Sequence, residues 1–442
     1  MSSRSRLCAA CIQVLACLSF STALFLPRSA HAEKVLVKGD NWDVYTDGRV
    51  GAFLSWVVGD GAPVANKMIT LPDGSVVPEV INGGQWPVNA KQASETSQGT
   101  VNAMRVRSGF IGNVLGFGVR TELWPNLKAS AYLQMWSFVE SEGRRKDYPN
   151  PVDVRQGYAK LEGPWGSFLA GRTRTLFSRG ATDINTLYAH RWGIGFPNQI
   201  DSKGPTQGMV GFGVLGSGFA SGLIYGTPVL AGFQLNVGVF DPVSLSAGGW
   251  SRTQLARPEA ELTFERPFGS LGKVVLFVNG AYQKVYKPGY CVASATTGPC
   301  DETAEGVGYG GRLEVGPVRL GAAGHYGKGL GLSFALENSY AALDPANNLR
   351  TFDGYYVQSQ IVVKQFDLFA GYGITRVFLT DLDKTLPQYS NIKNQIGING
   401  GVVYNMTENV HFDLEYMRAE ANWWLGEKQV LHNFATGMTV NW

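Results

Sequence analysis

Apolar and polar residues alternate along most of the chain, which is typical of β-strands whose two faces meet different surroundings. The clearest run, residues 410–416, reads Val-His-Phe-Asp-Leu-Glu-Tyr, with every apolar side chain on one face. The same alternation recurs at 274–283, 355–363, 395–404 and 430–442. No apolar stripe of helical period runs to a comparable length, so the pattern predicts an all-β protein.

Strand length and loop length favour a membrane barrel over a soluble sandwich. The alternating runs have about ten residues, whereas soluble strands average about 5–6 and a tilted membrane-spanning strand needs about 9–11. Short turns alternate with long polar loops; the turns lie at 124–126, 163–166, 267–272, 316–317, 364–365 and 406–408, and the loops at 142–152, 176–206, 242–256, 287–304, 329–351, 379–391 and 425–428. This asymmetry is typical of outer-membrane barrels.

These connections predict a transmembrane antiparallel β-barrel of about 16 strands, which is wide enough to enclose an aqueous channel. The first strand is expected near 41–58, and the last is expected to end at Trp442. Residues 59–100 are too long and too polar for one strand and are expected to form the first external loop.

Composition agrees with this fold class. Only 17% of the residues are charged, and 56 of 442 are glycine, whereas typical soluble domains have about 25% charged residues and about 7% glycine. The aromatic and aliphatic content excludes a disordered chain. Only residues 7–26 approach the ~20 apolar residues that a spanning helix needs, which excludes a polytopic helical membrane protein.

The N-terminal stretch is typical of a secretory signal peptide. Arg4 and Arg6 precede the apolar run 7–26, and Ala-His-Ala at 30–32 provides a cleavage site. We predict a cleaved signal over residues 1–32 and one barrel domain over 33–442; the alternative is an uncleaved anchor helix. Because the signal carries three arginines and no acid, its removal leaves a formally neutral chain. Neutrality argues against nucleic acid as a partner.

Two cysteines, Cys291 and Cys300, remain after the predicted signal is removed. In an oxidising compartment, two cysteines that bracket one short loop indicate a disulfide, the alternative being two inert thiols. Their spacing does not match a metal site, and no histidine lies nearby in the sequence.

Motifs for chemistry are weak. Two Gly-x-Gly-x-x-Gly matches, at 211–216 and 306–311, open no predicted helix, so they lack the phosphate-binding helix N-terminus. The histidines show no metal-ligand spacing, and no Gly-x-Ser-x-Gly elbow occurs. We therefore expect no cofactor, no metal and no catalysis, although a barrel enzyme with a spatially assembled Ser/His pair stays an alternative.

Several motifs resemble those of the Gram-negative general porins. Residues 104–112 resemble an early strand of that family that ends in Gly-Phe-x-Gly, and 155–166 resemble its Arg-x-x-Tyr-x-x-Leu strand followed by a glycine turn. Residues 168–172 resemble the strand that leads into the constriction loop. The resemblance implies a homotrimer of 16-stranded barrels in the outer membrane, each narrowed by an inward-folded loop, here expected at about 173–206.

The resemblance also implies an arginine ladder in the lumen. By motif position the candidates are Arg107, Arg155 and Arg172, and alternation predicts Arg155, Arg172 and Arg174 inward with Leu169 and Gly171 outward. The expected constriction loop lacks the family's acidic segment and contains only two acidic residues. The residues that we expect at the narrowest point of the channel are Arg179, Asp183 and Arg191. We therefore predict a mild anion preference.

The last strand is expected to carry the assembly signal. Phe434, Met438, Val440 and Trp442 share one face, which predicts contact with lipid and recognition by the outer-membrane assembly machinery. The function predicted is passive diffusion of ions and small hydrophilic solutes. A channel selective for sugars or organic anions is the nearest alternative, and a secreted β-rich binding module is a more remote one.

Overall fold

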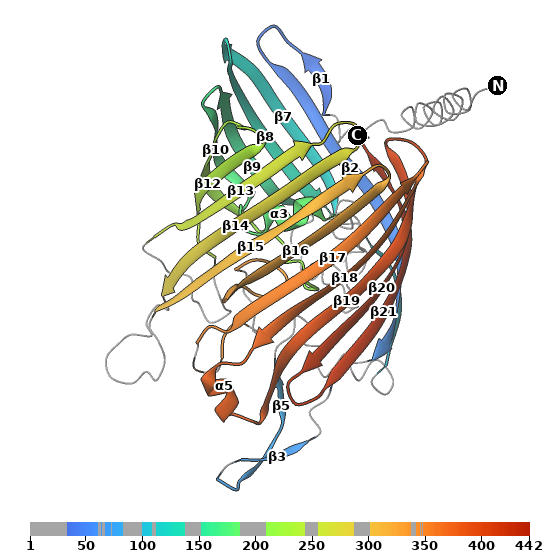
Figure 1. Ribbon diagram of the computed structural model, residues 1–442. Helices are drawn as coiled ribbons and strands as arrows, with labels where there is room; N and C mark the ends of the chain where they lie inside the picture. The colour runs from blue at the N-terminus through green and yellow to red at the C-terminus, as the bar shows by residue number, and fades with distance from the viewer. Residues whose placement is uncertain are drawn as a thin grey trace, which may run out of the picture.

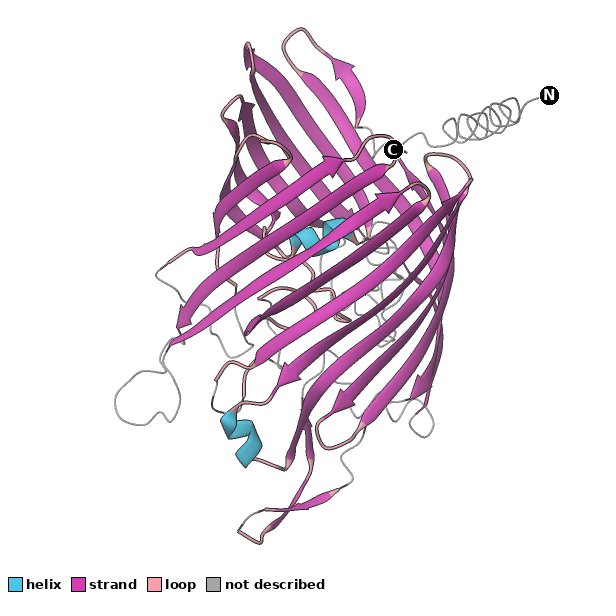
Figure 2. Ribbon diagram, in the orientation of Figure 1, coloured by secondary structure: helices cyan, strands magenta, loops and turns pink. Residues whose placement is uncertain are grey.

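The computed structural model is a barrel of β-strands (Figures 1 and 2). It describes residues 33–60, 63, 67–71, 73–82, 100–107, 112–137, 152–185, 209–243, 255–286, 301–336, 342–344, 346 and 348–442. The predicted signal peptide, residues 1–32, lies outside the described residues. No described helix is both long and apolar enough to cross a bilayer.

The described strands form a closed 16-strand antiparallel barrel, as the alternation predicts. Its wall consists of β2 (Asp43–Asp60), β6 (Thr100–Arg107) continued by β7 (Asn113–Trp124), β8 (Leu127–Ser137), β9 (Val152–Gly163), β10 (Gly166–Arg174), β11 (Phe219–Gly226), β12 (Phe233–Phe240), β13 (Arg257–Pro267), β14 (Gly272–Tyr286), β15 (Asp301–Val315), β16 (Val318–Lys328), β17 (Thr351–Val363), β18 (Phe366–Phe378), β19 (Tyr389–Asn405), β20 (Val410–Trp423) and β21 (Lys428–Asn441). Each strand pairs with the next along the chain.

The barrel closes where β21 pairs with β2, from Arg49 opposite Asn441 to Gly59 opposite Leu431. A further strand, β1 (Lys34–Lys38), pairs with the start of β2, with Lys34 opposite Thr46. The strands β1 and β21 therefore pair with consecutive parts of the same edge of β2, so the two ends of the barrel domain lie next to each other. The sequence pattern did not predict β1.

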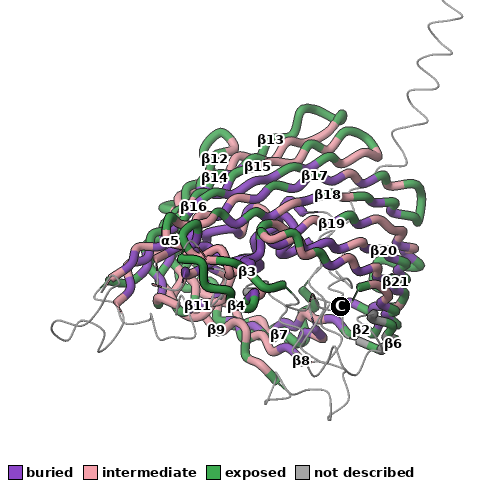
Figure 3. Tube along the Cα trace, turned by 90° about the horizontal axis from the view of Figure 1, so that it is seen from below, coloured by how far each residue is buried: buried purple, intermediate pink, exposed green. Residues whose placement is uncertain are grey.

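Alternation sorts side chains between lipid and lumen, and exposed and buried positions alternate along β15, β17 and β18 when the barrel is viewed from below (Figure 3). Aromatic residues gather at two levels of the outer face. Trp56 and Tyr416 lie 5.7 and 5.1 Å from the ring of Phe434, which pairs with Tyr416 at the middle of β20 and β21. Phe366 lies 5.1 Å from Tyr404 on the turn side, where an aromatic belt marks the membrane interface of a barrel.

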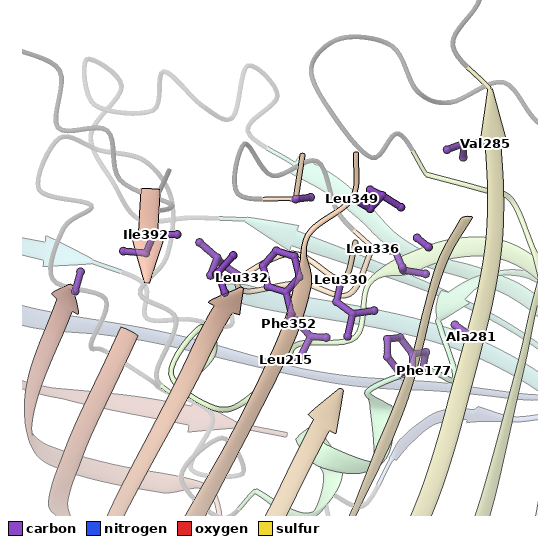
Figure 4. Packing of buried hydrophobic residues seen from close by; sticks show 14 of the residues in the cluster. Phe177, Leu215, Ala281, Val285, Leu330, Leu332, Leu336, Leu349, Phe352 and Ile392 are labelled. Carbon is purple, nitrogen blue, oxygen red and sulfur yellow. The ribbon is translucent and has the colours of Figure 1, made fainter. Parts of the chain in front are cut away.

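The lumen is partly filled by a hydrophobic core at the end where the long loops emerge (Figure 4). Segments from two loops, the one after β10 and the one after β16, pack there against the inner wall of β14, β15 and β17–β20. Its members are Phe177, Leu215, Ala281, Val285, Ala304, Leu330, Leu332, Leu336, Ala342, Leu349, Phe352, Val377, Ile392, Ala421 and Trp423. Burying so many apolar side chains fixes both loops inside the barrel.

The external loops carry secondary structure of their own. In the first loop, β3 (Met68–Thr70) and β4 (Val76–Pro78) form a hairpin, and β5 (Val80–Asn82) pairs in parallel with the start of β19. The loop after β18 contains α5 (Asp381–Thr385). Asp383 of α5 accepts two 2.7 Å hydrogen bonds from Arg350, and both side chains are buried.

Candidate functional site

The loop that follows β10, here called the inner loop, folds into the lumen. After Arg174 the chain turns into the barrel, where Phe177 is completely buried. The backbone N–H of Phe177 donates to Glu259 Oε2 at 2.8 Å, and that of Ser178 donates to Asn279 Oδ1 at 3.3 Å. These bonds start α3 (Arg179–Ile184), which lies inside the ring of strands (Figure 2).

Hydrogen bonds from the wall hold α3 in place. Tyr356 Oη donates to the carbonyl of Ala181 and Gln358 Nε2 to the carbonyl of Ile184, both at 2.7 Å. Gly180 allows the helix to approach the wall, because a Cβ there would lie 2.3 Å from the ring of Phe277. A helix fixed in this way narrows the channel at one place.

The inner loop is longer than the sequence predicts. Alternation and motif position placed it at about 173–206, but β10 continues through Arg174 and β11 begins at Phe219. Residues 209–218 return along the inner wall, where Phe212 and Val214 are completely buried and Gly213 N–H donates to Thr375 Oγ1 at 2.9 Å. They belong to the loop because their apolar side chains pack inside the barrel.

Both described arginines of the predicted loop set are ion-paired. Arg174 Nη1 lies 2.7 Å from Asp183 Oδ1 within the loop, and Arg179 Nε donates to Glu261 Oε2 of β13 at 2.9 Å. The side chain of Arg179 is 24% exposed, whereas that of Glu261 is 2% exposed. The sequence analysis considered only the acids within the loop. It missed Glu259 and Glu261 of the wall, which contact the loop in space but lie far from it in the sequence.

Arg155 lies on the lumen side of β9. Its guanidinium carbon is 4.9 Å from the ring of Trp136 and 5.7 Å from that of Phe219, and its Nε lies 2.7 Å from Asp153 Oδ2. Trp136 Nε1 donates to Gln134 on the same inner face of β8. Stacking on two rings holds the cation at one position beside the channel.

The prediction for Arg172 is wrong, since the register places it on the other face of β10. Leu169 packs against buried Ile224, and Thr173 Oγ1 donates to Gln156 at 3.0 Å, so the odd-numbered positions from 169 to 173 face inward; Arg174, at the end of the strand, reaches Asp183 of the inner loop. Arg172 shares its face with the exposed Phe168. Alternation could not decide this strand, because apolar residues occupy both of its faces.

Four other predicted residues are not placed by the structure. Arg191, Cys291 and Cys300 lie outside the described residues. The backbone of Arg107 pairs with Phe53 of β2 at the end of β6, and the structure does not describe its side chain.

A row of tyrosines lines the inner face of β2, β8 and β9. The rings of Tyr45 and Tyr132 stack at 6.3 Å, Tyr158 follows at 5.6 Å from Tyr132, and Tyr132 Oη donates to Asp47 Oδ1 at 2.7 Å. Arg120 lies over Tyr45 at 5.2 Å. The sequence analysis missed this row. One signal was available: Gly116 and Gly118 alternate with exposed apolar residues on β7, so they face the lumen, where the rings of Tyr132 and Tyr45 leave no space for a Cβ.

Known proteins share this architecture. A family model described as Gram-negative porin matches residues 19–422. The outer membrane channel DcaP of Acinetobacter baumannii has a TM-score of 0.63 at 15% identity, covering 92% of this chain and 100% of that chain. No curated protein matches the sequence significantly.

Two further solved structures agree at low identity. An anion-selective porin from Comamonas acidovorans has a TM-score of 0.54 at 14% identity, covering 91% of this chain and all (100%) of its own. OmpF of Salmonella typhi, in complex with daunomycin, has a TM-score of 0.54 at 12% identity, with coverages of 93% and 100%. At these identities the likeness concerns the fold, and the match of the family model over most of the sequence decides membership: the chain belongs to the Gram-negative porins, which are β-barrel channels of the outer membrane.

Proposed function

We propose that the protein is a passive diffusion channel for ions and small hydrophilic solutes, with a mild preference for anions, and that it catalyses no reaction. The observation that carries the proposal is the orientation of the Arg179–Glu261 pair. The side chain of Arg179, on the helix inside the barrel, is 24% exposed, whereas that of Glu261 on the wall is 2% exposed.

An ion pair of this orientation is neutral in sum but presents its positive end to a passing ion. Inside a channel with low-dielectric walls, such fixed charges act strongly, because few water molecules screen them. Arg155, held on Trp136 and Phe219, adds a second cation beside the channel. The pairing with acids keeps the preference mild.

Planar-bilayer recording of the purified protein tests whether it conducts. Stepwise, ohmic current increments on addition of protein support a water-filled diffusion channel. Correctly folded barrels that insert without producing current would overturn the proposal.

A channel selective for organic anions is the second candidate. The row of Tyr45, Tyr132 and Tyr158, flanked by Arg120, offers ring faces and a cation to a solute with an apolar body and a carboxylate. Concentration-dependent block of the ionic current by an aromatic carboxylate, but not by a sugar of similar size, would favour this candidate.

We also propose that three copies associate through the wall that contains β8–β10. Arg172 pairs with Gly157 near the middle of β9 and shares the outer face with Phe168. An arginine that faces lipid at mid-membrane costs about 2–4 kcal/mol, a cost that contact with another subunit removes. Light scattering in mild detergent tests the trimer, and a monomeric wild type would contradict it.

The remaining proposals concern processing and the fifth long loop. We propose cleavage after residue 32, so that the mature chain begins at Glu33, and a disulfide between Cys291 and Cys300. N-terminal sequencing of the protein from outer membranes tests the first, since a terminus at Met1 would exclude it.

A further inference from the structure

The inner wall of the barrel carries a buried carboxylate on β20 that has no hydrogen-bond partner among the described residues. Asp413 is 3% exposed, and neither its Oδ1 nor its Oδ2 accepts a hydrogen bond from any described group. Burying an ionised carboxylate without a partner is strongly unfavourable. In native proteins such a group is rare and commonly marks a bound water or ion.

A second carboxylate lies beside it. Glu415 follows Asp413 by two residues on β20, so it occupies the same inner face about 7 Å away, and it is 6% exposed. On the neighbouring strand, Asn399 of β19 donates its Nδ2 to Glu415 Oε1, while its own Oδ1 has no described partner. Asn399 is 3% exposed, so its amide oxygen is shielded from solvent as well.

Thr439 of β21 adds a hydroxyl group from the other side. It pairs with His411, whereas Asp413 pairs with Gly437, so Thr439 is the diagonal neighbour of Asp413 on the inner face. Thr439 is 1% exposed, and its Oγ1 makes no hydrogen bond to a described group. Oxygen atoms without partners therefore gather on the adjacent strands β19, β20 and β21 (Figure 1).

The surroundings of the two carboxylates are apolar. Asp413 lies opposite Gly437, and a Cβ at that glycine would lie 2.3 Å from the ring of Phe53, so the ring fills the space there. On its other side Asp413 lies opposite Val403, which belongs to the apolar cluster that joins the wall to Met209 of the inner loop. Because apolar surroundings screen charge poorly, two like charges there need a counter-ion.

A proton satisfies this group of residues less well than a metal ion does. A protonated Asp413 would carry an O–H donor, but no described acceptor lies within hydrogen-bond distance of either oxygen, and Glu415 would keep its charge. A divalent cation neutralises both carboxylates. Within the described ranges no three histidine, cysteine or acidic side chains gather as they do in transition-metal sites. Two carboxylates with neutral oxygens suit calcium, which accepts more irregular coordination than magnesium.

We propose that Asp413, Glu415, Asn399 and Thr439 bind one calcium ion on the inner wall, with the two carboxylates supplying the negative charge. The ion joins β19, β20 and β21 beside the apolar cluster that holds the inner loop. Sequence motifs could not indicate this site, because its ligands come from three strands. The proposal goes beyond the proposed diffusion function, since it concerns an ion held in the wall and not the ions that pass.

Isothermal titration calorimetry with calcium chloride tests the proposal. The full-length mature protein is refolded in mild detergent without lipopolysaccharide, which itself binds calcium, and is freed of metal with a chelator. Wild type should bind one calcium ion per chain, and should bind magnesium at least tenfold more weakly. Asp413→Asn should weaken calcium binding at least tenfold. Glu302→Gln removes a different buried acid of the inner wall, on β15, and should bind calcium as wild type does.

Thermal unfolding with and without calcium keeps the test decisive if Asp413→Asn does not refold. A ligand that binds only the folded state raises the unfolding temperature, so calcium should raise that of wild type. Glu415→Gln, which keeps the size of the side chain, should lose at least half of the increase. A wild type that shows no saturable calcium binding would overturn the proposal, and so would an equal loss of binding in Asp413→Asn and Glu302→Gln.

Discussion

The C-terminal residue Trp442 exchanges two backbone hydrogen bonds with Gly48, each 3.0 Å long. A Cβ at Gly48 would lie 2.4 Å from the indole ring of Trp442, so the ring rests directly on the first wall strand. The last residue of the chain therefore seals the seam of the barrel, and an unsealed seam would expose two unpaired strand edges.

Deletion of Trp442 is expected to reduce assembly, because it removes both hydrogen bonds to Gly48 and the last apolar contact of the assembly signal. The folded fraction in outer membranes, measured by heat-modifiable gel migration, should fall at least severalfold. Met438→Leu keeps an apolar outward side chain and should assemble normally. Unchanged folding of the deletion variant would contradict this role of Trp442.

The wall contacts of α3 predict a conductance effect. Tyr356→Phe combined with Gln358→Ala removes two hydrogen bonds to α3 carbonyls, each worth about 1 kcal/mol. The loosened helix should give larger and noisier single-channel currents, with little change in barrel stability. Tyr355→Phe, on the exposed outer face of β17, is the control. Currents identical to wild type would mean that α3 does not limit conduction.

Docking of the first external loop is expected to depend on pH. Lys67 of this loop pairs with Glu427 and lies 3.8 Å from Glu79. Burial and the neighbouring Glu427 carboxylate raise the pKa of Glu79. Burial also acts to raise the pKa of Glu427, but hydrogen bonds from Lys67 and Ser390 outweigh it, so that pKa is lowered.

The two shifts work in opposite directions on stability. Because the pKa of Glu79 is raised in the docked loop, the docked loop binds this proton more tightly than the free loop does. Docking therefore weakens as pH rises from 4.5, the usual glutamate pKa, through the raised pKa of docked Glu79. The lowered pKa of Glu427 weakens docking as pH falls below 4.5. Docking should therefore be strongest near that pH.

Amide hydrogen exchange of residues 67–82, corrected for its intrinsic pH dependence, measures this docking. Glu79→Gln should remove the loss of protection toward neutral pH and keep the loss at low pH. Glu408→Gln, in a short turn at the other end of the barrel, should leave the profile unchanged. A flat wild-type profile would exclude the carboxyl pair as a pH-sensitive contact.

The predicted disulfide has a local effect. Closing a loop as short as that between Cys291 and Cys300 contributes about 2–3 kcal/mol in the chain-entropy model. Because residues 287–300 connect β14 to β15 and belong to neither strand, reduction should speed cleavage there by protease several-fold and leave heat-modifiable migration unchanged. Mass spectrometry of unreduced peptides decides the point: two free thiols would exclude the bond.

The wall of the barrel could be predicted from sequence because each strand repeats one local rule. Phe412 and Leu414 face lipid while Glu415 faces inward, and the short turn at Lys364 fixes where one strand ends. The rule gave the wrong face for β10, because the apolar side chain of Leu169 packs inside the barrel and does not face lipid.

Contacts between distant segments could not be predicted in this way. The pairing of Arg179 with Glu261 depends on where the inner loop lies against β13, and nothing near Arg179 in the sequence indicates it. The core that joins Leu336 to Phe177 likewise depends on two loops folding into the same lumen. Local patterns report which face a residue occupies, but not which loop packs on it.

The arginines beside the channel predict how selectivity should change. Arg155→Ser with Arg179→Gln removes two cations and leaves Asp153 and Glu261 without their partners. This variant should lose the anion preference and become cation-selective. Arg376→Gln removes an arginine that pairs with Asp353 on the outer face, so it should conduct as wild type does.

The reversal potential of the wild-type channel in a tenfold potassium chloride gradient tests the central claim most directly. A mildly anion-selective channel gives a potential displaced toward the chloride equilibrium potential, and the displacement should shrink as the salt concentration rises on both sides, because salt screens the exposed guanidinium groups. A potential displaced toward that of potassium would contradict the account.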